Sequence, residues 1–518
     1  MLKPHKLLGL VLALMLHTAY AIPEGPDPNS PEWLQREASN YAKTLEAPTE
    51  QLSSPAFVQR LATQSLTNQQ DYLLRAASDP SWLDPRTLNT DVTPLCTSWM
   101  LQCAGDPFRY PGVDTFYDTE GVVTPVVFYD AECARLSGHV WLPKNIAADA
   151  RLPGVIIETG SIQAPEPLYW WMAQALVRRG YAVMTFDVRG QGRSDQQSPN
   201  GGQGSNINSA VFWDGLVNVI DFFRSTVAVP YPHNVTCSGT YPTTVTAYNP
   251  IADHVDMTRL GLVGHSLGAT GVSIVQGYGA SKAAPWPGKL DKQNPVTVIV
   301  AWDSLSANAE SGSQPAAIPR VPAMGQSSEY GIGGTPKQTA PDPEGHKTAY
   351  TAWRDAGLPV YQLTIQGSTH FEWSLIPTFP ATSWCPTVGA HGCEGGYGRP
   401  LAEYYSVAWL DRWMKRSGEV GFDDADARLL KDADWIERYS FYSRAARSFT
   451  TRDGRKVLCE DIRAGCAPVP ANPNPPTTEA RGTSNSNGPI SLGGALSWSM
   501  LLIGAVFAAL RRVAARTS

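Results

Sequence analysis

Gly264-His265-Ser266-Leu267-Gly268 is the stretch that decides the fold, because it matches the pattern G-x-S-x-G and stands between two regular segments. The apolar run 260–263 before it predicts a short buried strand, and residues 268–277 after it have helical spacing. A serine on a sharp turn from strand to helix sits in strained backbone, so glycines must flank it to let other segments approach. The pattern therefore predicts Ser266 as an exposed nucleophile.

The segments around this turn offer donors for a negatively charged oxygen. The helix after Ser266 presents its positive end, and the amide of Leu267 can donate to the oxyanion of a tetrahedral intermediate. A second donor is expected in the turn after the apolar run 153–157, where Thr159-Gly160-Ser161-Ile162 occurs. The backbone amide of Ser161 or of Ile162 is the candidate.

A serine hydroxyl also needs a base, which is expected further along the chain. Residues 360–366 predict a strand, and His370 lies in the loop 367–371 that follows it. The other histidines lie in inserts or away from strand ends. His370 is therefore the candidate base, the alternative being a loop histidine that bonds only to the backbone.

The order of apolar segments predicts an α/β fold with a mainly parallel central sheet and helices on both faces. Segments 124–129 and 138–142 predict edge strands, and buried strands alternate with helices after them. We assign residues 111–466 to this domain. Residues 22–110 are expected to form an N-terminal helical extension, because residues 31–86 have a mostly polar helical pattern.

With these parts in order, the segment 124–416 resembles the α/β-hydrolase fold, most specifically in its G-x-S-x-G turn and its loop 187–195. Residues 298–305, and 326–330 with 366–370, are similar to the secreted platelet-activating-factor acetylhydrolases and, more loosely, to cutinase-like bacterial polyesterases. The resemblance implies an esterase or lipase that cleaves carboxylic esters through an acyl-enzyme and needs no cofactor. A peptidase or amidase with the same residues, or a non-catalytic surface protein that kept the fold for binding, are the alternatives.

Two acids compete for the third place in the catalytic triad. Asp303 ends the strand 296–302, where the acetylhydrolase branch places its acid, and Glu329 follows the strand near 321–324, where most α/β-hydrolases place theirs. Either carboxylate would hold the imidazole of His370 in the required tautomer. The resemblance favours Asp303.

Charge and motif content argue against two kinds of partner. The net charge is −6 and no run of five Lys or Arg occurs within the chain, so nucleic acid is not expected. The nine histidines are scattered and neither CxxC nor HExxH is present, so no metal site is expected.

Residues 1–21 have the parts of a secretory signal peptide. Lys3 and Lys6 precede the apolar run 7–16, and Ala19-Tyr20-Ala21 fits the small-x-small rule of signal peptidase. The run is shorter than the roughly 20 residues of a membrane span, which favours cleavage over an uncleaved anchor. The mature chain is then expected to begin at Ile22.

The other end carries an apolar tail, 490–518, behind a Pro-, Asn-, Thr- and Ser-rich linker, 467–489, that we expect to be disordered. Residues 490–510 are uncharged and long enough to span a bilayer, and three arginines follow them, Arg511, Arg512 and Arg516. With Gly493-Gly494, the tail resembles the Gly-Gly C-terminal sorting tails of Gram-negative bacteria. That resemblance implies cleavage by a rhomboid-type protease and a product released or held at the cell surface; a permanent transmembrane anchor is the alternative.

Eight cysteines lie between the two apolar ends, which agrees with an oxidising compartment. Three pairs are close in sequence: Cys96 with Cys103, Cys385 with Cys393, and Cys459 with Cys466. By elimination, Cys133 would pair with Cys237. The short staples would clip loops and not create the fold.

Overall fold

The computed structural model describes residues 27, 30–83, 103–161, 164–205, 207–332, 336–337, 339–374, 387–389, 392–394 and 398–466. The expected signal peptide, linker and C-terminal tail lie outside these residues. Within the described ranges, no helix is both long and apolar enough to cross a membrane.

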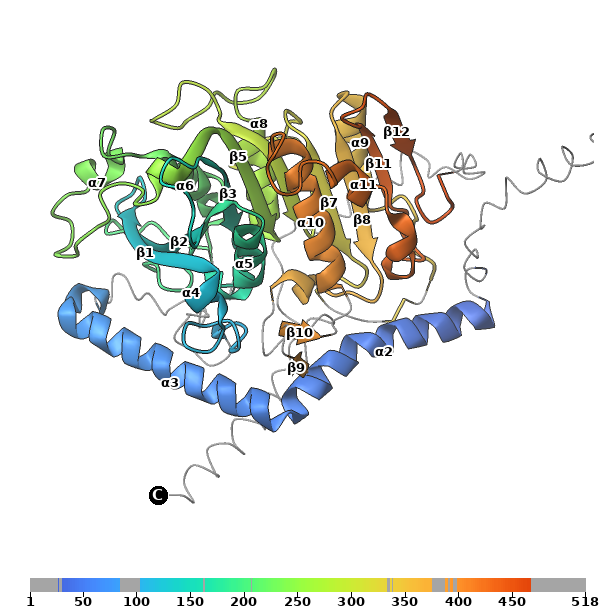
Figure 1. The fold of residues 1–518 in the computed structure, drawn as a ribbon, viewed down its shortest axis with the longest axis horizontal. Helices are drawn as coiled ribbons and strands as arrows, with labels where there is room; N and C mark the ends of the chain where they lie inside the picture. The colour runs from blue at the N-terminus through green and yellow to red at the C-terminus, as the bar shows by residue number, and fades with distance from the viewer. Residues whose placement is uncertain are drawn as a thin grey trace, which may run out of the picture. The chain divides into compact units, whose positions relative to one another are not determined.

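A ten-stranded sheet forms the centre of the fold, in the order β1-β2-β4-β3-β5-β6-β7-β8-β11-β12 (Figure 1). Strands β3 to β8 are parallel to one another, whereas β1 and β2 at one edge and β11 and β12 at the other are antiparallel to their neighbours. The strands are β1 (Gly121–Tyr129), β2 (Arg135–Pro143), β3 (Leu152–Glu158), β4 (Ala182–Phe186), β5 (Val255–His265), β6 (Val296–Trp302), β7 (Ala323–Ser328), β8 (Val360–Ile365), β11 (Ala446–Thr450) and β12 (Lys456–Cys459), with a separate hairpin of β9 (Thr387–Gly389) and β10 (Gly392–Glu394).

The expected mainly parallel sheet is confirmed, and every predicted strand is present. The sequence does not predict β11 and β12, which are short and carry polar residues. They are strands because β8 has an edge to which β11 can pair.

Helices cover both faces of the sheet, as the α/β pattern predicts. Helices α5 and α10 pack on one face, and α6, α8 and α9 pack on the other. The helices are α2 (Pro31–Ser53), α3 (Pro55–Ser78), α4 (Phe116–Thr119), α5 (Trp170–Arg178), α6 (Asp214–Arg224), α7 (Pro232–Thr236), α8 (Leu267–Gly277), α9 (Thr348–Asp355), α10 (Arg399–Met414) and α11 (Ala425–Leu429).

The central strands are buried on both faces, so successive side chains enter opposite layers of the core. In β3, Val155 and Ile157 belong to the layer under α5 and α10, and Ile156 belongs to the other layer. In the first layer, Trp171 of α5 stacks on Trp302 of β6 with ring centroids 5.3 Å apart. This packing holds the carboxyl end of β6, which precedes one of the candidate acids.

Helices α2 and α3 lie where the sequence predicts an N-terminal helical extension. Each begins at a serine whose hydroxyl accepts a hydrogen bond from the first turn, Ser30 from the amide of Trp33 and Ser54 from the amide of Phe57. Buried side chains of α3 include Phe57 and Leu61, which pack with Ala104.

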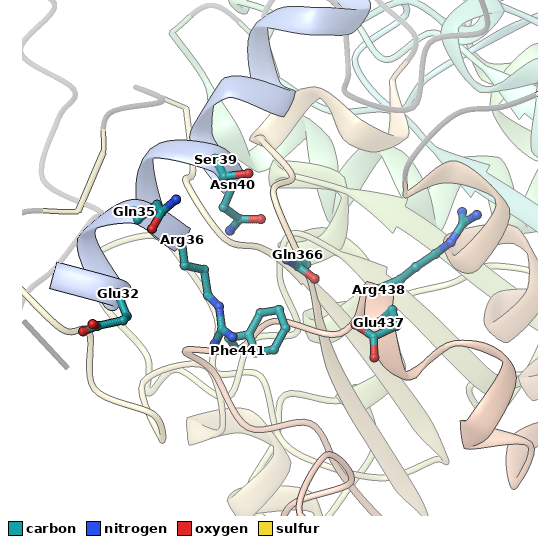
Figure 2. A pocket seen from close by; sticks show the side chains of 9 residues that line it. All are labelled: Glu32, Gln35, Arg36, Ser39, Asn40, Gln366, Glu437, Arg438 and Phe441. Carbon is teal, nitrogen blue, oxygen red and sulfur yellow. The ribbon is translucent and has the colours of Figure 1, made fainter. Parts of the chain in front are cut away.

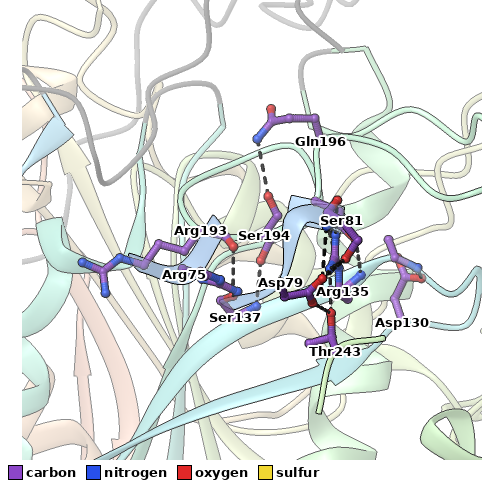
Figure 3. A network of polar contacts seen from close by, with 12 residues as sticks. Arg75, Asp79, Ser81, Asp130, Arg135, Ser137, Arg193, Ser194, Gln196 and Thr243 are labelled. Carbon is purple, nitrogen blue, oxygen red and sulfur yellow. Dashed lines mark hydrogen bonds and ion pairs between the residues drawn. The ribbon is translucent and has the colours of Figure 1, made fainter. Parts of the chain in front are cut away.

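A polar network joins the end of α3 to the sheet (Figure 3). The guanidinium groups of Arg75 and Arg135 lie over the ring of Trp82, 3.4 and 3.5 Å from its centroid. Arg135 of β2 forms an ion pair with Asp195 at 3.0 Å, and both side chains are fully buried. The extension is tied to the sheet by the cations stacked on Trp82, by a hydrogen bond from Arg75 to Ser137 at 2.9 Å, and by an ion pair of Asp79 with Arg135 at 3.5 Å.

Two of the four expected disulfides lie in the described residues: Cys133 with Cys237, across 104 residues, and Cys459 with Cys466. The other two pairs, 96 with 103 and 385 with 393, each include a side chain outside the described residues. Those two pairings stay predictions.

Replacement of Asp195 by Ala should lower the free energy of unfolding by about 3–5 kcal/mol, because it removes the fully buried partner of the Arg135 guanidinium and leaves only the longer ion pair with Asp79 at 3.5 Å. Chemical denaturation monitored by fluorescence measures the loss. The control is Glu120→Gln, since Glu120 pairs with Arg178 at the surface and its loss should cost at most about 1 kcal/mol. Equal losses in the two variants would contradict the role given to the buried pair.

Candidate active site

Ser266 occupies a sharp turn between β5 and α8, with φ 58° and ψ −123°. The two flanking glycines are required by close packing. A Cβ at Gly264 would lie 2.3 Å from the carbonyl oxygen of Gly268, and a Cβ at Gly268 would lie 2.3 Å from that of Thr159. The strained backbone that the G-x-S-x-G pattern predicts is therefore present, and it projects the serine from the carboxyl end of the sheet.

The structure brings Ser266, His370 and Asp303 together in one hydrogen-bonded row. The Nε2 atom of His370 lies 2.9 Å from Oγ of Ser266, and its Nδ1 atom lies 2.6 Å from Oδ2 of Asp303. The side chains of His370 and Asp303 are 14% and 12% exposed, so the row is sheltered but still within reach of solvent. These three residues follow the carboxyl ends of β5, β6 and β8, which lie on the same side of the parallel sheet.

The backbone around Asp303 aims its carboxylate at the imidazole. The Oδ1 atom accepts from the amide of Ser328 at 2.9 Å, and Oδ2 accepts from the hydroxyl of Ser328 at 2.8 Å. Burial alone raises the pKa of this carboxyl group, but the hydrogen bond and charge of His370, together with Ser328, hold the pKa of Asp303 below its usual range. Asp303 is therefore an anion beside the imidazole.

Glu329, the alternative acid, is held by other partners. Its carboxylate accepts from the side chains of Asn40 and Ser440 and, at 2.6 Å, from the amide of Gly367. Burial raises the pKa of Glu329 despite these donors. The geometry thus places Glu329 as a link between α2 and the loop that leads to His370, while Asp303 contacts the imidazole.

A cavity of about 590 Å³ lies beside this link (Figure 2). Residues of α2 form one wall, and Gln366, in the loop before His370, forms part of the other. The full lining is Glu32, Gln35, Arg36, Ser39, Asn40, Gln366, Glu437, Arg438 and Phe441.

The expected oxyanion donors lie in two turns near Ser266. Leu267 is the first residue of α8, where helix amides have no acceptor within the helix. A Cβ at Gly160 would lie 3.2 Å from Cβ of Ser266, so the turn after β3 that contains Ser161 adjoins the serine. Ile162 lies outside the described residues, and its role stays a prediction.

Three buried residues beside the serine are not predicted from the sequence: Tyr169, His265 and Glu158. Tyr169 and His265 hydrogen-bond to each other at 2.8 Å between Oη and Nδ1. Glu158, at the end of β3, is opposite Gly264 in the strand register and fully buried. In the described part of the chain neither of its carboxyl oxygens has a hydrogen-bond partner. His265 belongs to the G-x-S-x-G pentapeptide and could have been found from the sequence. Its hydrogen-bond partner, Tyr169, is 96 residues away and could not.

The row Ser266, His370 and Asp303 can transfer an acyl group, because it supplies a nucleophile, a base and an anion that orients the base. Among the described residues, no group of three or more His, Cys, Asp or Glu side chains could hold a metal ion.

The chain has the α/β-hydrolase fold. Its mainly parallel sheet, its helices on both faces and its strained serine between β5 and α8 together define that fold. No family model matches the chain.

One curated relative is a hydrolase of Aspergillus aculeatus named AcrC, which is 30% identical over 186 residues. The alignment covers 34% of this chain, and the chain spans only 35% of the length of that relative.

Similar solved structures include an acylaminoacyl peptidase of Pyrococcus horikoshii and an esterase of Pyrococcus furiosus. The peptidase aligns with a TM-score of 0.36 and 12% identity over 62% of this chain and 46% of its own. The esterase aligns with a TM-score of 0.33 and 14% identity over 59% of this chain and 96% of its own. The fold assignment rests on the sheet and the serine turn, and not on these alignments.

Because Glu158 is buried, we expect the free energy of unfolding to depend on pH. Burial raises the pKa of Glu158 well above its usual value, so the folded protein holds this carboxyl group neutral while the unfolded chain ionises it. Stability is therefore lost as the pH rises above the usual pKa of a glutamate, until the raised pKa is reached. The limiting slope is about 1.4 kcal/mol per pH unit.

Glu158→Gln removes this ionisation and leaves a side chain of the same shape. We expect the difference in unfolding free energy, variant minus wild type, to increase as the pH rises from about 5 to 8, because only the wild-type protein loses stability through this ionisation. Urea unfolding at several pH values measures the difference. Parallel curves for the two proteins would show that Glu158 does not change its charge on unfolding.

Proposed function

We propose that this protein is an exported serine hydrolase that cleaves carboxylic esters through an acyl-enzyme. The observation that carries the proposal is the pair of short contacts from His370, 2.9 Å to Ser266 and 2.6 Å to Asp303. The name of the relative AcrC agrees with a hydrolase. The resemblance of residues 298–305 to acetylhydrolases favours esters as substrates.

The proposed chemistry has two halves. Oγ of Ser266 attacks the ester carbonyl carbon while Nε2 of His370 takes the hydroxyl proton. The oxyanion is held by the amide of Leu267 and by one from Ser161 or Ile162, and the alcohol leaves with the proton from His370. Water, deprotonated by His370, then attacks the acyl carbon; the bond to Oγ of Ser266 breaks, the carboxylic acid leaves, and His370 returns the proton to Oγ. Asp303 holds the imidazole in place and stabilises its charged form.

Export and surface attachment are proposed from the two ends of the chain. Signal peptidase would remove residues 1–21, and the tail 490–518 would anchor the protein or be cut by a rhomboid-type protease. The disulfide between Cys133 and Cys237 supports an oxidising location for the folded domain.

A peptidase is the second candidate, because the same three residues also cleave amides. A test with both kinds of substrate distinguishes the two. We would purify residues 22–487 from an oxidising compartment and compare nitrophenyl esters of increasing acyl length with peptide nitroanilides.

Ser266→Ala should lower ester turnover by at least about 10³-fold with folding intact, because no other group replaces the nucleophile. The matched control is Ser273→Ala in α8, the helix that follows Ser266; the hydroxyl of Ser273 donates to the carbonyl of Ala269 at 2.6 Å. That variant should turn over ester at close to the wild-type rate. Turnover retained by Ser266→Ala would end the proposal, and turnover of amides alone would move it to a peptidase.

Asp303→Asn and Glu329→Gln should separate the two candidate acids. The first removes the anion 2.6 Å from Nδ1 of His370 and should lower kcat by about 10²- to 10⁴-fold. The second keeps an acceptor for Gly367 and should mainly lower the melting temperature. Steady-state kinetics and thermal unfolding of both variants decide. A larger kcat loss in Glu329→Gln would transfer the role to Glu329.

A further inference from the structure

A second line of hydrogen bonds runs behind Ser266 and joins the loops on either side of it. The amide of Gly160 lies 3.0 Å from Oη of Tyr169, which lies 2.8 Å from Nδ1 of His265. On the far side of the ring, Nε2 of His265 lies 2.8 Å from the carbonyl oxygen of His370. The line thus reaches from the turn after β3 to the backbone of the proposed base.

The chemistry of the four groups allows the protons only one arrangement. A carbonyl oxygen can only accept, so Nε2 of His265 must carry a hydrogen and donate it to His370. In the neutral ring Nδ1 then accepts, and the hydroxyl of Tyr169 is its donor. The oxygen of Tyr169 is left to accept from the amide of Gly160. Every donor has its acceptor, so the line sets the tautomer of His265.

Burial keeps both side chains in these forms. Tyr169 is fully buried and His265 is 2% exposed. Burial, followed by the charge of His370, lowers the pKa of His265 to about 3. Burial likewise raises the pKa of Tyr169 well above its usual value. Neither group changes its charge at an ordinary assay pH, so neither is a second general base.

The line ends at two loops, the turn at Gly160 and the loop of His370. The proposed reaction requires these two loops at a fixed distance from each other. Gly160 is against Ser266 and precedes Ser161, a candidate oxyanion donor. The carbonyl of His370 belongs to the residue whose imidazole meets Ser266 at 2.9 Å. A fixed distance between these loops is a fixed distance between the oxyanion donors and the base.

We propose that Tyr169 and His265 are positioning residues, which hold the turn at Gly160 and the backbone of His370 at the separation that acyl transfer requires. The inference rests on the proposed function. It assigns a role to the residue that precedes the nucleophile and to a tyrosine remote in sequence, and neither touches the substrate.

Tyr169→Phe tests the line with the loss of one hydroxyl group. We expect kcat for a short nitrophenyl ester to fall about 10- to 100-fold with KM changed by less than about twofold, because the reacting groups are misplaced but the substrate still binds. The control is Tyr231→Phe, another fully buried tyrosine, whose hydroxyl donates to the carbonyl of Tyr129 at 2.8 Å. It should lose similar stability and keep its kcat.

His265 is tested by a conservative and a non-conservative variant. Gln can still donate a hydrogen bond to the carbonyl of His370, whereas Leu cannot. His265→Gln should therefore retain more of the wild-type kcat than His265→Leu. If His265→Leu does not fold, the comparison of Tyr169→Phe with Tyr231→Phe still decides.

A fluorophosphonate that labels the serine separates failure of this inference from failure of the proposed function. If the wild-type protein is labelled and Tyr169→Phe is labelled about 10-fold or more slowly, with Tyr231→Phe unaffected, the inference is supported. Equal labelling rates and equal kcat in all three proteins would overturn it and leave the function standing. A wild-type protein that neither reacts with the probe nor cleaves ester would overturn both.

Discussion

The close packing of the Ser266 turn against the end of β3 is the constraint on which the site depends. With φ at 58°, the serine backbone is strained, and the turn closes only because no side chain at Gly264 or Gly268 separates it from the neighbouring carbonyls. The same approach brings the turn at Gly160 against the serine. The same close packing thus positions the nucleophile and the candidate oxyanion donors. The base, His370, comes instead from the loop after strand β8.

Three carboxyl groups near the serine differ in the donors and charges that surround them. Asp303 accepts twice from Ser328 and contacts His370, so its charged form is favoured in spite of burial. Glu329 has three donors, yet burial still raises its pKa. Glu158 has none within the described residues, and burial raises its pKa well above its usual value. Asp303 and Glu329 each have three hydrogen-bond donors, so it is the added charge of His370 that distinguishes the carboxylate able to serve as the anion beside the imidazole.

The N-terminal helices contribute to the surroundings of the site. Glu37 of α2 accepts from the hydroxyl of Tyr330 at 3.0 Å, and Asn40 donates to Glu329. The amide of Tyr330 in turn donates to the carbonyl of Ser368, two residues before His370. Helix α2 is therefore connected to the loop of the proposed base through residues 329–330.

The sequence alone determined the class of fold, since strand and helix periods and the glycines around Ser266 are local patterns. It also placed Ser266 and His370 at the ends of the strands where the structure has them. The strands β11 and β12 could not be predicted from the sequence, because their pairing depends on the edge of β8, which exists only when the sheet is formed. Only the tertiary structure decided which of Asp303 and Glu329 meets the imidazole, and only it revealed the line through Tyr169 and His265. Those contacts join residues 67 and 96 positions apart, and such distances are set by how the strand ends pack and not by any local pattern.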